Sequence, residues 1–276
     1  MVKIVNMIKI LNMVICMSIG TFIFAQSGGG NGFSDDYLYG ALHVEKYDPI
    51  YFMPFSMDFR EHDDRDPIEA SFQISLKKTV IKNISPIGFD IGIAFTLTAW
   101  WQLYAFSNPF REINFGPELY FYFPFHQKAD GAGLFCHGIK VAVAHKSNGR
   151  GDDNNRSWNR VYLEFPISIG WFQFIPRVWW SFAGIGNDFY EKDISRYMGM
   201  CDLTIAGHWN SHVLQVYGRS NFNYKNINAA LRVDYSYPIA ATGLYFYVQY
   251  FLGYGESLID YDKPVNKIGA GIALSR

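Results

Sequence analysis

Apolar and polar residues alternate along most of this chain from about residue 49 onward. In the stretch 88–103, for example, Phe89 and Ile91 belong to an apolar row, while Asp90 and Gly92 belong to a polar or small row. Residues two apart share one face of a β-strand, so this alternation predicts strands with one apolar and one polar face. Short polar stretches with turn-forming residues separate the rows. The pattern therefore predicts an all-β fold.

Twelve such stretches can be counted. They lie near residues 49–54, 68–78, 88–103, 111–124, 135–147, 158–169, 171–181, 196–207, 209–218, 227–237, 243–254 and 265–275. Several contain ten or more residues, which is long for a globular sheet but suits tilted strands that cross a bilayer. An even number of antiparallel strands is typical of bacterial outer-membrane barrels. We therefore expect residues 49–276 to form a single twelve-stranded antiparallel transmembrane β-barrel.

The composition is compatible with a barrel but does not require one. Aromatic residues make up 18% of the 276 residues, with 19 Tyr and 24 Phe. Such a content suits aromatic girdles at two membrane interfaces, although the large aromatic core of a β-sandwich would also explain it. Charged residues in the polar rows, such as Arg232 and Asp234, could face either a lumen or water. The net charge of −1 gives no polybasic surface, so nucleic acid is not an expected partner.

The N-terminal residues favour export and, with it, the barrel. Lys3 and Lys9 precede an apolar run, 10–24, that ends at Ala25 before a polar segment. This arrangement predicts a secretory signal peptide over residues 1–25. We expect residues 26–48 to form a short extended segment that leads into the barrel. No later stretch is apolar for long enough to predict a membrane-spanning helix.

Candidate chemistry lies at the ends of two adjacent predicted strands. His145 and Ser147 continue the apolar row of Val141 and Val143, and Asn159 begins the apolar row of the next strand. In a membrane barrel the apolar face meets lipid, so all three polar side chains would point outward. Burying polar groups at such a face costs free energy, which suggests a functional reason for their position, although a place at the aqueous edge of the apolar band would also explain it.

These three residue types could together activate a nucleophile. A serine hydroxyl becomes nucleophilic when a neutral histidine accepts its proton, and a third group must hold the other ring nitrogen of that histidine. Ser147, His145 and Asn159 could fill these roles in this order. Gly149 permits a tight backbone, so N–H groups in this turn could stabilise an oxyanion. A serine near a histidine is by itself a weak signal, because most such pairs are structural.

A family resemblance strengthens this interpretation. The segment His145-Lys146-Ser147-Asn148-Gly149-Arg150, followed by Arg156-Ser157-Trp158-Asn159-Arg160, resembles the outer membrane phospholipase A family. Further similar motifs, in the same order, lie at residues 100–103, 109–112, 197–199 and 253–261. The similarity runs from about residue 68 to residue 272. It implies a twelve-stranded barrel in the bacterial outer membrane, with an active site on the outer wall.

The resemblance also implies an activity, a cofactor and a partner. The expected activity is calcium-dependent hydrolysis of acyl esters of phospholipids and lysophospholipids. Ser147 would be the nucleophile, His145 the base and Asn159 the orienting residue, with Gly149 in the oxyanion hole. The active form is expected to be a homodimer that shares Ca²⁺ between two chains. The expected calcium ligands are the Arg150 carbonyl, Asn155 and, from the second chain, Ser107.

Three departures from the family pattern leave alternatives open. Asn155 stands where a serine is expected, and Leu97 where a glutamine is expected to hydrogen-bond across the dimer. The chain ends in Leu274-Ser275-Arg276 instead of an aromatic residue. Lys146, Asn155 and the altered C-terminus leave room for a non-enzymatic barrel, either a pore or a structural protein with a decayed site. An acyltransferase barrel is a third.

Overall fold

The structure is a computed structural model. It describes residues 44–62, 65–84, 86–125, 133–151, 153–182, 193–223 and 225–275. The predicted signal peptide, residues 1–25, and most of the 26–48 segment lie outside the described residues. No helix among the described residues is long and apolar enough to cross a membrane.

Fifteen strands and one short helix make up the described chain. They are β1 (Glu45–Lys46), β2 (Ile50–Asp58), β3 (Ile68–Ile84), β4 (Phe89–Trp101), β5 (Phe110–Pro124), β6 (Leu134–Cys136), β7 (Gly138–Ser147), β8 (Ser157–Glu164), β9 (Ile167–Ile169), β10 (Phe172–Phe182), α3 (Ile194–Met198), β11 (Cys201–Trp209), β12 (His212–Ser220), β13 (Ala229–Pro238), β14 (Tyr245–Gly253) and β15 (Val265–Ser275).

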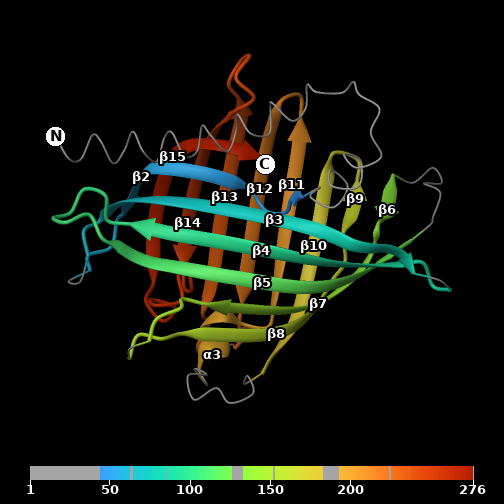
Figure 1. The fold of residues 1–276 in the computed structure, drawn as a ribbon. Helices are drawn as coiled ribbons and strands as arrows, with labels where there is room; N and C mark the ends of the chain where they lie inside the picture. Colours follow the sequence, from blue (N-terminus) through green and yellow to red (C-terminus); the bar gives the residue numbers. More distant parts are fainter. Residues whose placement is uncertain are drawn as a thin grey trace, which may run out of the picture. The chain divides into compact units, whose positions relative to one another are not determined.

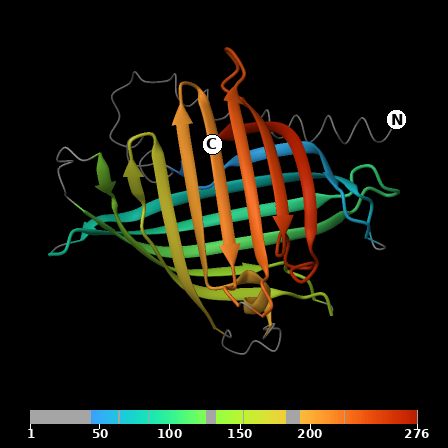
Figure 2. The same cartoon turned by 180° about the vertical axis from the view of Figure 1, so that it is seen from behind.

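The strands form one closed antiparallel barrel. Each wall strand pairs with its neighbour, β15 pairs with β2, and β10 pairs with β11, so no edge is left open. β6 and β7 form one wall strand that is interrupted at His137, and β8 and β9 form another that is interrupted at Phe165 and Pro166. With these two joined, the wall has the twelve strands that the sequence predicts, and the predicted fold is confirmed. Figures 1 and 2 show the barrel from opposite sides.

One end of the barrel carries mostly longer connections than the other. Tight turns at 170–171 and 210–211 join strands at what we call the turn end. Connections 102–109, 148–156 and 254–264 lie at the opposite end, which we call the loop end. Outer-membrane barrels have short periplasmic turns and longer external loops, so the loop end corresponds to the external side.

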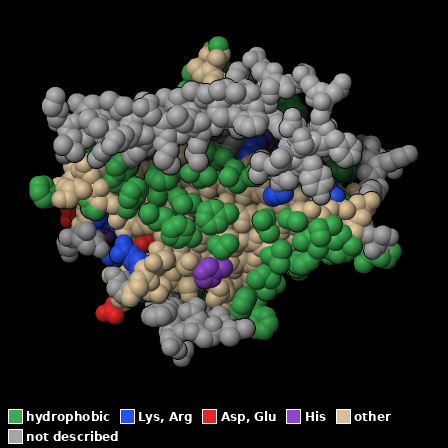
Figure 3. Space-filling view, in the orientation of Figure 1, with side chains coloured by type: hydrophobic (Ala, Val, Ile, Leu, Met, Phe, Trp, Pro, Cys, Tyr) green, Lys and Arg blue, Asp and Glu red, His purple; other side chains and the backbone are tan. Residues whose placement is uncertain are grey.

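The alternating rows face the sides that the sequence predicts. Val143 on β7 is 45% exposed and Val161 on β8 is 41% exposed, whereas Ala142 and Tyr162 between them are buried. Hydrophobic side chains gather on the outer surface over β3, β4 and β5 (Figure 3). The outside of the wall is therefore apolar, as a lipid-facing surface must be.

Ionic side chains fill the lumen near the loop end. Arg111 lies 2.9 Å from Glu69 and 2.5 Å from Asp260. Lys267 lies 2.7 Å from Glu69 and 2.6 Å from Glu256. All five side chains are at most 9% exposed. Paired buried charges of this kind fill the lumen at this end of the barrel.

Two features depart from the predicted element boundaries. Residues 196–198, which the alternation assigned to a strand, belong to α3, where Ile194 and Met198 are one helical turn apart and both buried. Gly199, at φ 67°, follows the helix before β11 begins. The two-residue strand β1, which the sequence did not predict, pairs with β3. Cys136 and Cys201 are free thiols and do not form a disulfide.

Candidate active site

His145 and Asn159 occupy directly paired positions on β7 and β8. His145 Nδ1 lies 2.7 Å from Asn159 Oδ1. An amide oxygen can only accept, so Nδ1 carries the proton and donates it, which leaves Nε2 with a free lone pair. Both residues share the outward row of Val143 and Val161. The histidine is therefore held in the tautomer that a general base needs.

Ser147 lies two residues beyond His145, at the loop end of the same outward row. Two residues of a strand span roughly 6.6 Å, so the serine hydroxyl and a long histidine ring are neighbours on this face. Within the described residues, no hydrogen bond joins the Ser147 hydroxyl to His145. Catalytic hydrogen bonds often tighten only when substrate is present, so this arrangement is compatible with proton transfer.

Gly149, two residues after Ser147, has a left-handed backbone conformation with φ 66°. A side chain is rarely accommodated at this φ, so the position favours glycine. A Cβ atom placed there would lie 3.4 Å from the ring of Phe115. Phe115 lies on β5, where it is paired with Ser147 of β7. The backbone thus turns sharply beside the serine, next to an aromatic ring on the outer face.

Asn148 clamps the loop between the two strands, a role that the sequence analysis missed. Its side chain is 6% exposed. Its Oδ1 accepts from the backbone N–H of Arg156 at 3.0 Å, and its Nδ2 donates to the carbonyl of Asn154 at 2.8 Å. The turn-forming preference of asparagine was the available signal. This clamp ties the segment after Ser147 to the segment before Asn159.

The three expected calcium ligands lie in two different loops. Arg150 and Asn155 lie in the β7–β8 loop, where both are partly buried. The Arg150 guanidinium donates to the Arg111 carbonyl at 2.6 Å and lies 3.4 Å from Glu112. Ser107 lies in the β4–β5 loop, is exposed, and has a φ of 65°. No cluster of three or more His, Cys, Asp or Glu side chains that could hold a metal occurs among the described residues.

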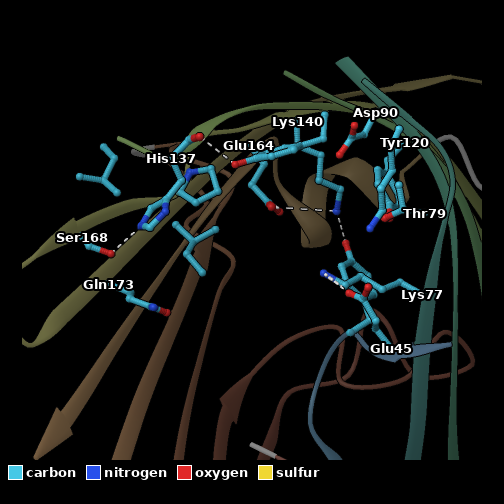
Figure 4. Close-up of a pocket in the computed structure, with 16 residues that line it drawn as sticks. Glu45, Lys77, Thr79, Asp90, Tyr120, His137, Lys140, Glu164, Ser168 and Gln173 are labelled. Atoms are coloured by element: carbon cyan, nitrogen blue, oxygen red, sulfur yellow. Dashed lines mark hydrogen bonds and ion pairs between the residues drawn. The ribbon is translucent and has the colours of Figure 1, made fainter. Parts of the chain in front are cut away.

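A separate cavity of about 520 Å³ opens in the lumen near the turn end. Figure 4 shows that His137, Lys140 and Glu164 line it together with Ser168 and Gln173. Lys140 is already paired with Glu118 at 2.8 Å. The cavity contains none of the outward-facing candidate residues, so it belongs to the barrel interior and not to this site.

Comparison with known proteins decides the family. The family model for phospholipase A1 matches residues 35–274. The chain belongs to the phospholipase A1 family. It is 34% identical over 222 residues to phospholipase A1 of Escherichia coli strain K12, which covers 80% of this chain and 73% of the relative. It is 31% identical over 260 residues to a putative phospholipase A1 of Neisseria meningitidis, covering 85% of this chain and 66% of the relative.

Solved structures of the family have the same fold. Outer membrane phospholipase A from Escherichia coli matches with a TM-score of 0.75 and 28% identity, covering 90% of this chain and 95% of that one. The Salmonella typhi outer membrane phospholipase, a dimer with bound calcium, matches with a TM-score of 0.76 and 28% identity, covering 86% of this chain and 94% of that one. This chain is therefore a phospholipase, built as a β-barrel of the bacterial outer membrane.

Proposed function

We propose that this phospholipase hydrolyses acyl esters with Ser147 as nucleophile, His145 as general base and Asn159 as the residue that orients the base. The 2.7 Å hydrogen bond between His145 Nδ1 and Asn159 Oδ1 carries the proposal. It lies on the lipid-facing wall, where an unexplained polar pair would be costly. The substrates are phospholipids and lysophospholipids of the surrounding membrane, whose ester groups lie at the edge of the apolar layer.

The reaction follows from this arrangement. The Ser147 oxygen attacks the ester carbonyl while His145 Nε2 takes the hydroxyl proton. The Gly149 N–H stabilises the negative oxygen of the tetrahedral intermediate. The intermediate collapses to an acyl-serine, and His145 returns the proton to the leaving alkoxide. Water then attacks the acyl-serine through the same base, which releases the fatty acid and restores Ser147.

The donor set of the two loops fits Ca²⁺. A backbone carbonyl at Arg150, an amide oxygen at Asn155 and a hydroxyl at Ser107 are all oxygen ligands, which calcium prefers, and water would complete the coordination. Bound Ca²⁺ would supply positive charge next to the developing oxyanion. Ser107 and Asn155 lie in different loops, and we assign Ser107 to the site of a second copy of the chain. On this proposal, the active form is a homodimer.

A fatty-acid release assay tests the proposed mechanism. The protein is refolded in detergent micelles and given phosphatidylcholine with calcium or with chelator. We expect release only with calcium, and none from Ser147→Ala. Ser157→Ala is the control for the loss of a serine. Ser157 lies on β8 opposite Ser147, but it is not one of the three proposed catalytic residues. Full activity of Ser147→Ala would overturn the serine mechanism.

Mixed dimers test the shared calcium site. Ser147→Ala and Ser107→Ala chains are each expected to be inactive alone. A mixture contains a dimer in which the intact Ser147 of one chain faces the intact Ser107 of the other. We therefore expect one of the two sites in each mixed dimer to be active. No recovery in a mixture whose dimers are shown to form would exclude Ser107 as a ligand supplied by the second chain.

A further inference from the structure

The side chain of Arg150 reaches from the β7–β8 loop back to the barrel wall. Its Nη2 donates to the carbonyl oxygen of Arg111 at 2.6 Å, and its Nε lies 3.4 Å from Glu112 Oε2. Both partners belong to β5. The Arg150 side chain is 32% exposed, so part of it is covered by the wall. The wall therefore holds one arginine of this loop at two points.

A β-bulge makes the Arg111 carbonyl available for this contact. The pairing of β4 with β5 skips Arg111, because its neighbours Phe110 and Glu112 are paired with adjacent residues of β4. In a bulge the extra residue is left unpaired, and bulges often lie beside active sites, where they redirect a group of the chain. Here the unpaired residue accepts a hydrogen bond from the β7–β8 loop instead of from a neighbouring strand.

Glu112 is a buried carboxylate whose two oxygens have different partners. Its side chain is 0% exposed. Its Oε1 accepts from Asn114 Nδ2 at 2.6 Å and from the backbone N–H of Ile259 at 3.2 Å. Its Oε2 faces Arg150, which among the described residues is the one cation within 4.0 Å of this carboxylate. A buried charge is stable only with such a partner, so this ion pair favours one position of the Arg150 side chain.

The oxygen atoms that we propose as calcium ligands in this loop are not used by the rest of the described chain. Among the described residues, no hydrogen bond reaches the Arg150 carbonyl or the side-chain amide of Asn155. Other atoms of the same residues are engaged. The Arg150 N–H donates to Asn148 Oδ1 at 3.4 Å, and the Asn155 carbonyl accepts from Arg156 at 2.9 Å. The loop thus leaves two oxygens open while it holds the residues that carry them.

We propose that Glu112 and the Arg111 carbonyl are positioning groups for calcium binding, because they hold the Arg150 guanidinium and thereby fix the Arg150 carbonyl before the ion binds. This inference rests on the proposed function, since it takes the Arg150 carbonyl as a calcium ligand. Groups that hold metal ligands in place typically contribute about 10–100-fold to metal affinity. Neither Glu112 nor the Arg111 carbonyl is itself assigned as a ligand.

The charge of Arg150 separates positioning from simple electrostatics. A guanidinium near the site repels Ca²⁺, so by charge alone its removal would strengthen calcium binding. If the side chain instead holds the backbone carbonyl in place, its removal weakens calcium binding, although the carbonyl itself is still present. Arg150→Ala therefore gives opposite results under the two explanations.

Calorimetric titration with Ca²⁺ tests the inference on the full chain, refolded in detergent micelles. All samples carry Ser147→Ala, so that hydrolysis contributes no heat. We expect Arg150→Ala to raise the dissociation constant for Ca²⁺ by about 10–100-fold. Arg150→Lys should recover part of the affinity, because an ammonium still donates to the Arg111 carbonyl but lacks the second arm of a guanidinium. Arg60→Ala removes an exposed arginine of the 59–67 loop and should bind Ca²⁺ like the parent chain.

Glu112→Asp gives a second test, because it keeps the charge but withdraws the carboxylate by one methylene group. We expect it to weaken Ca²⁺ binding by roughly tenfold. The unfolding midpoint in chelator shows whether each variant is folded, and Arg150→Ala decides the test if Glu112→Asp is not. Unchanged or tighter binding by Arg150→Ala, or unchanged binding by folded Glu112→Asp, would overturn the inference and leave the proposed calcium site intact. Absence of Ca²⁺ binding by the parent chain would instead reject that calcium site, and the inference with it.

Discussion

His145 Nδ1 and Asn159 Oδ1 lie 2.7 Å apart across two directly paired strands. The strand register itself brings the two residues opposite each other, and no flexible loop intervenes between either residue and the sheet. A histidine held in this way is already oriented before substrate binds, so little conformational entropy is lost on the way to the transition state. Asn159 is only 8% exposed, although Val161, two residues further along the same row, is 41% exposed.

Removing the base is expected to cost more activity than removing its partner. His145→Ala should lower kcat by roughly 10³–10⁴-fold, because proton transfer from Ser147 is lost. Asn159→Ala should lower it by about 10–100-fold, since the ring keeps its basic nitrogen but loses its fixed orientation. Fatty-acid release under saturating substrate measures both. Asn159→Asp keeps an acceptor oxygen and serves as the control, and we expect it to retain more activity than Asn159→Ala. Equal losses in His145→Ala and Asn159→Ala would contradict the assigned roles.

Gly149→Ala is expected to reduce both activity and stability. The left-handed backbone at φ 66° becomes strained by about 1–2 kcal/mol when a Cβ is added. A displaced N–H would lower kcat by about 10²–10³-fold. Gly151 is the matched control in the same loop, because its φ is ordinary and no atom lies within 4 Å of an added Cβ. Fatty-acid release and urea unfolding of both variants test this. Similar activities for Gly149→Ala and Gly151→Ala would remove Gly149 from the oxyanion hole.

Leu97→Gln is expected to strengthen the proposed homodimer. Leu97 is paired with Phe115 on β5 and belongs to the outward-facing row of β4. A glutamine there could hydrogen-bond to its copy in a second chain, which contributes about 0.6 kcal/mol on average in a membrane. Sedimentation equilibrium in micelles should show a dissociation constant roughly threefold lower than that of wild type. Leu119→Gln places the same side chain on the outward row of β5 and is the control. A dissociation constant for Leu97→Gln equal to that of wild type, as expected for Leu119→Gln, would exclude this face from the interface.

Breaking the loop-end ionic network is expected to destabilise the barrel strongly. Arg111→Gln leaves Glu69 and Asp260 as buried carboxylates without one of their partners, which costs about 3–5 kcal/mol. Lys77→Gln breaks a half-exposed pair with Glu45, 3.6 Å apart, and is expected to cost at most about 1 kcal/mol. Unfolding by guanidinium chloride in micelles compares the two. A loss below that of Lys77→Gln would show that the network does not support the fold.

The same network predicts that the barrel does not conduct. Paired charges and side chains fill the lumen between Glu69, Arg111 and Lys267. Planar bilayers that contain the refolded protein should therefore show no steady ion current, and lipid hydrolysis should be the activity that is measured. Stable conductance without hydrolysis would favour the alternative of a non-enzymatic pore.

The local pattern of the sequence determined which face of each strand meets lipid. Period-two alternation depends only on strand geometry, so the outward placement of His145, Ser147 and Asn159 followed from counting residues. The twelve wall strands could be anticipated for the same reason, whereas the tight backbone at Gly149 was indicated by the absence of a side chain there. Helix α3 could not, because its apolar residues are compatible with either period over so short a segment.

The tertiary structure alone decided which residues meet across the barrel. Closure of β15 onto β2 brings Lys267 to Glu69, although they are far apart in the sequence. It likewise sets Arg65 of the 59–67 loop 2.7 Å from Asp260 of the 254–264 loop, a relationship that no local pattern encodes. Charge in the lumen depends on distances between distant strands, whereas strand faces depend on neighbours two residues away. For that reason the sequence indicated the proposed reactive surface, and only the folded barrel showed the ion pairs inside it.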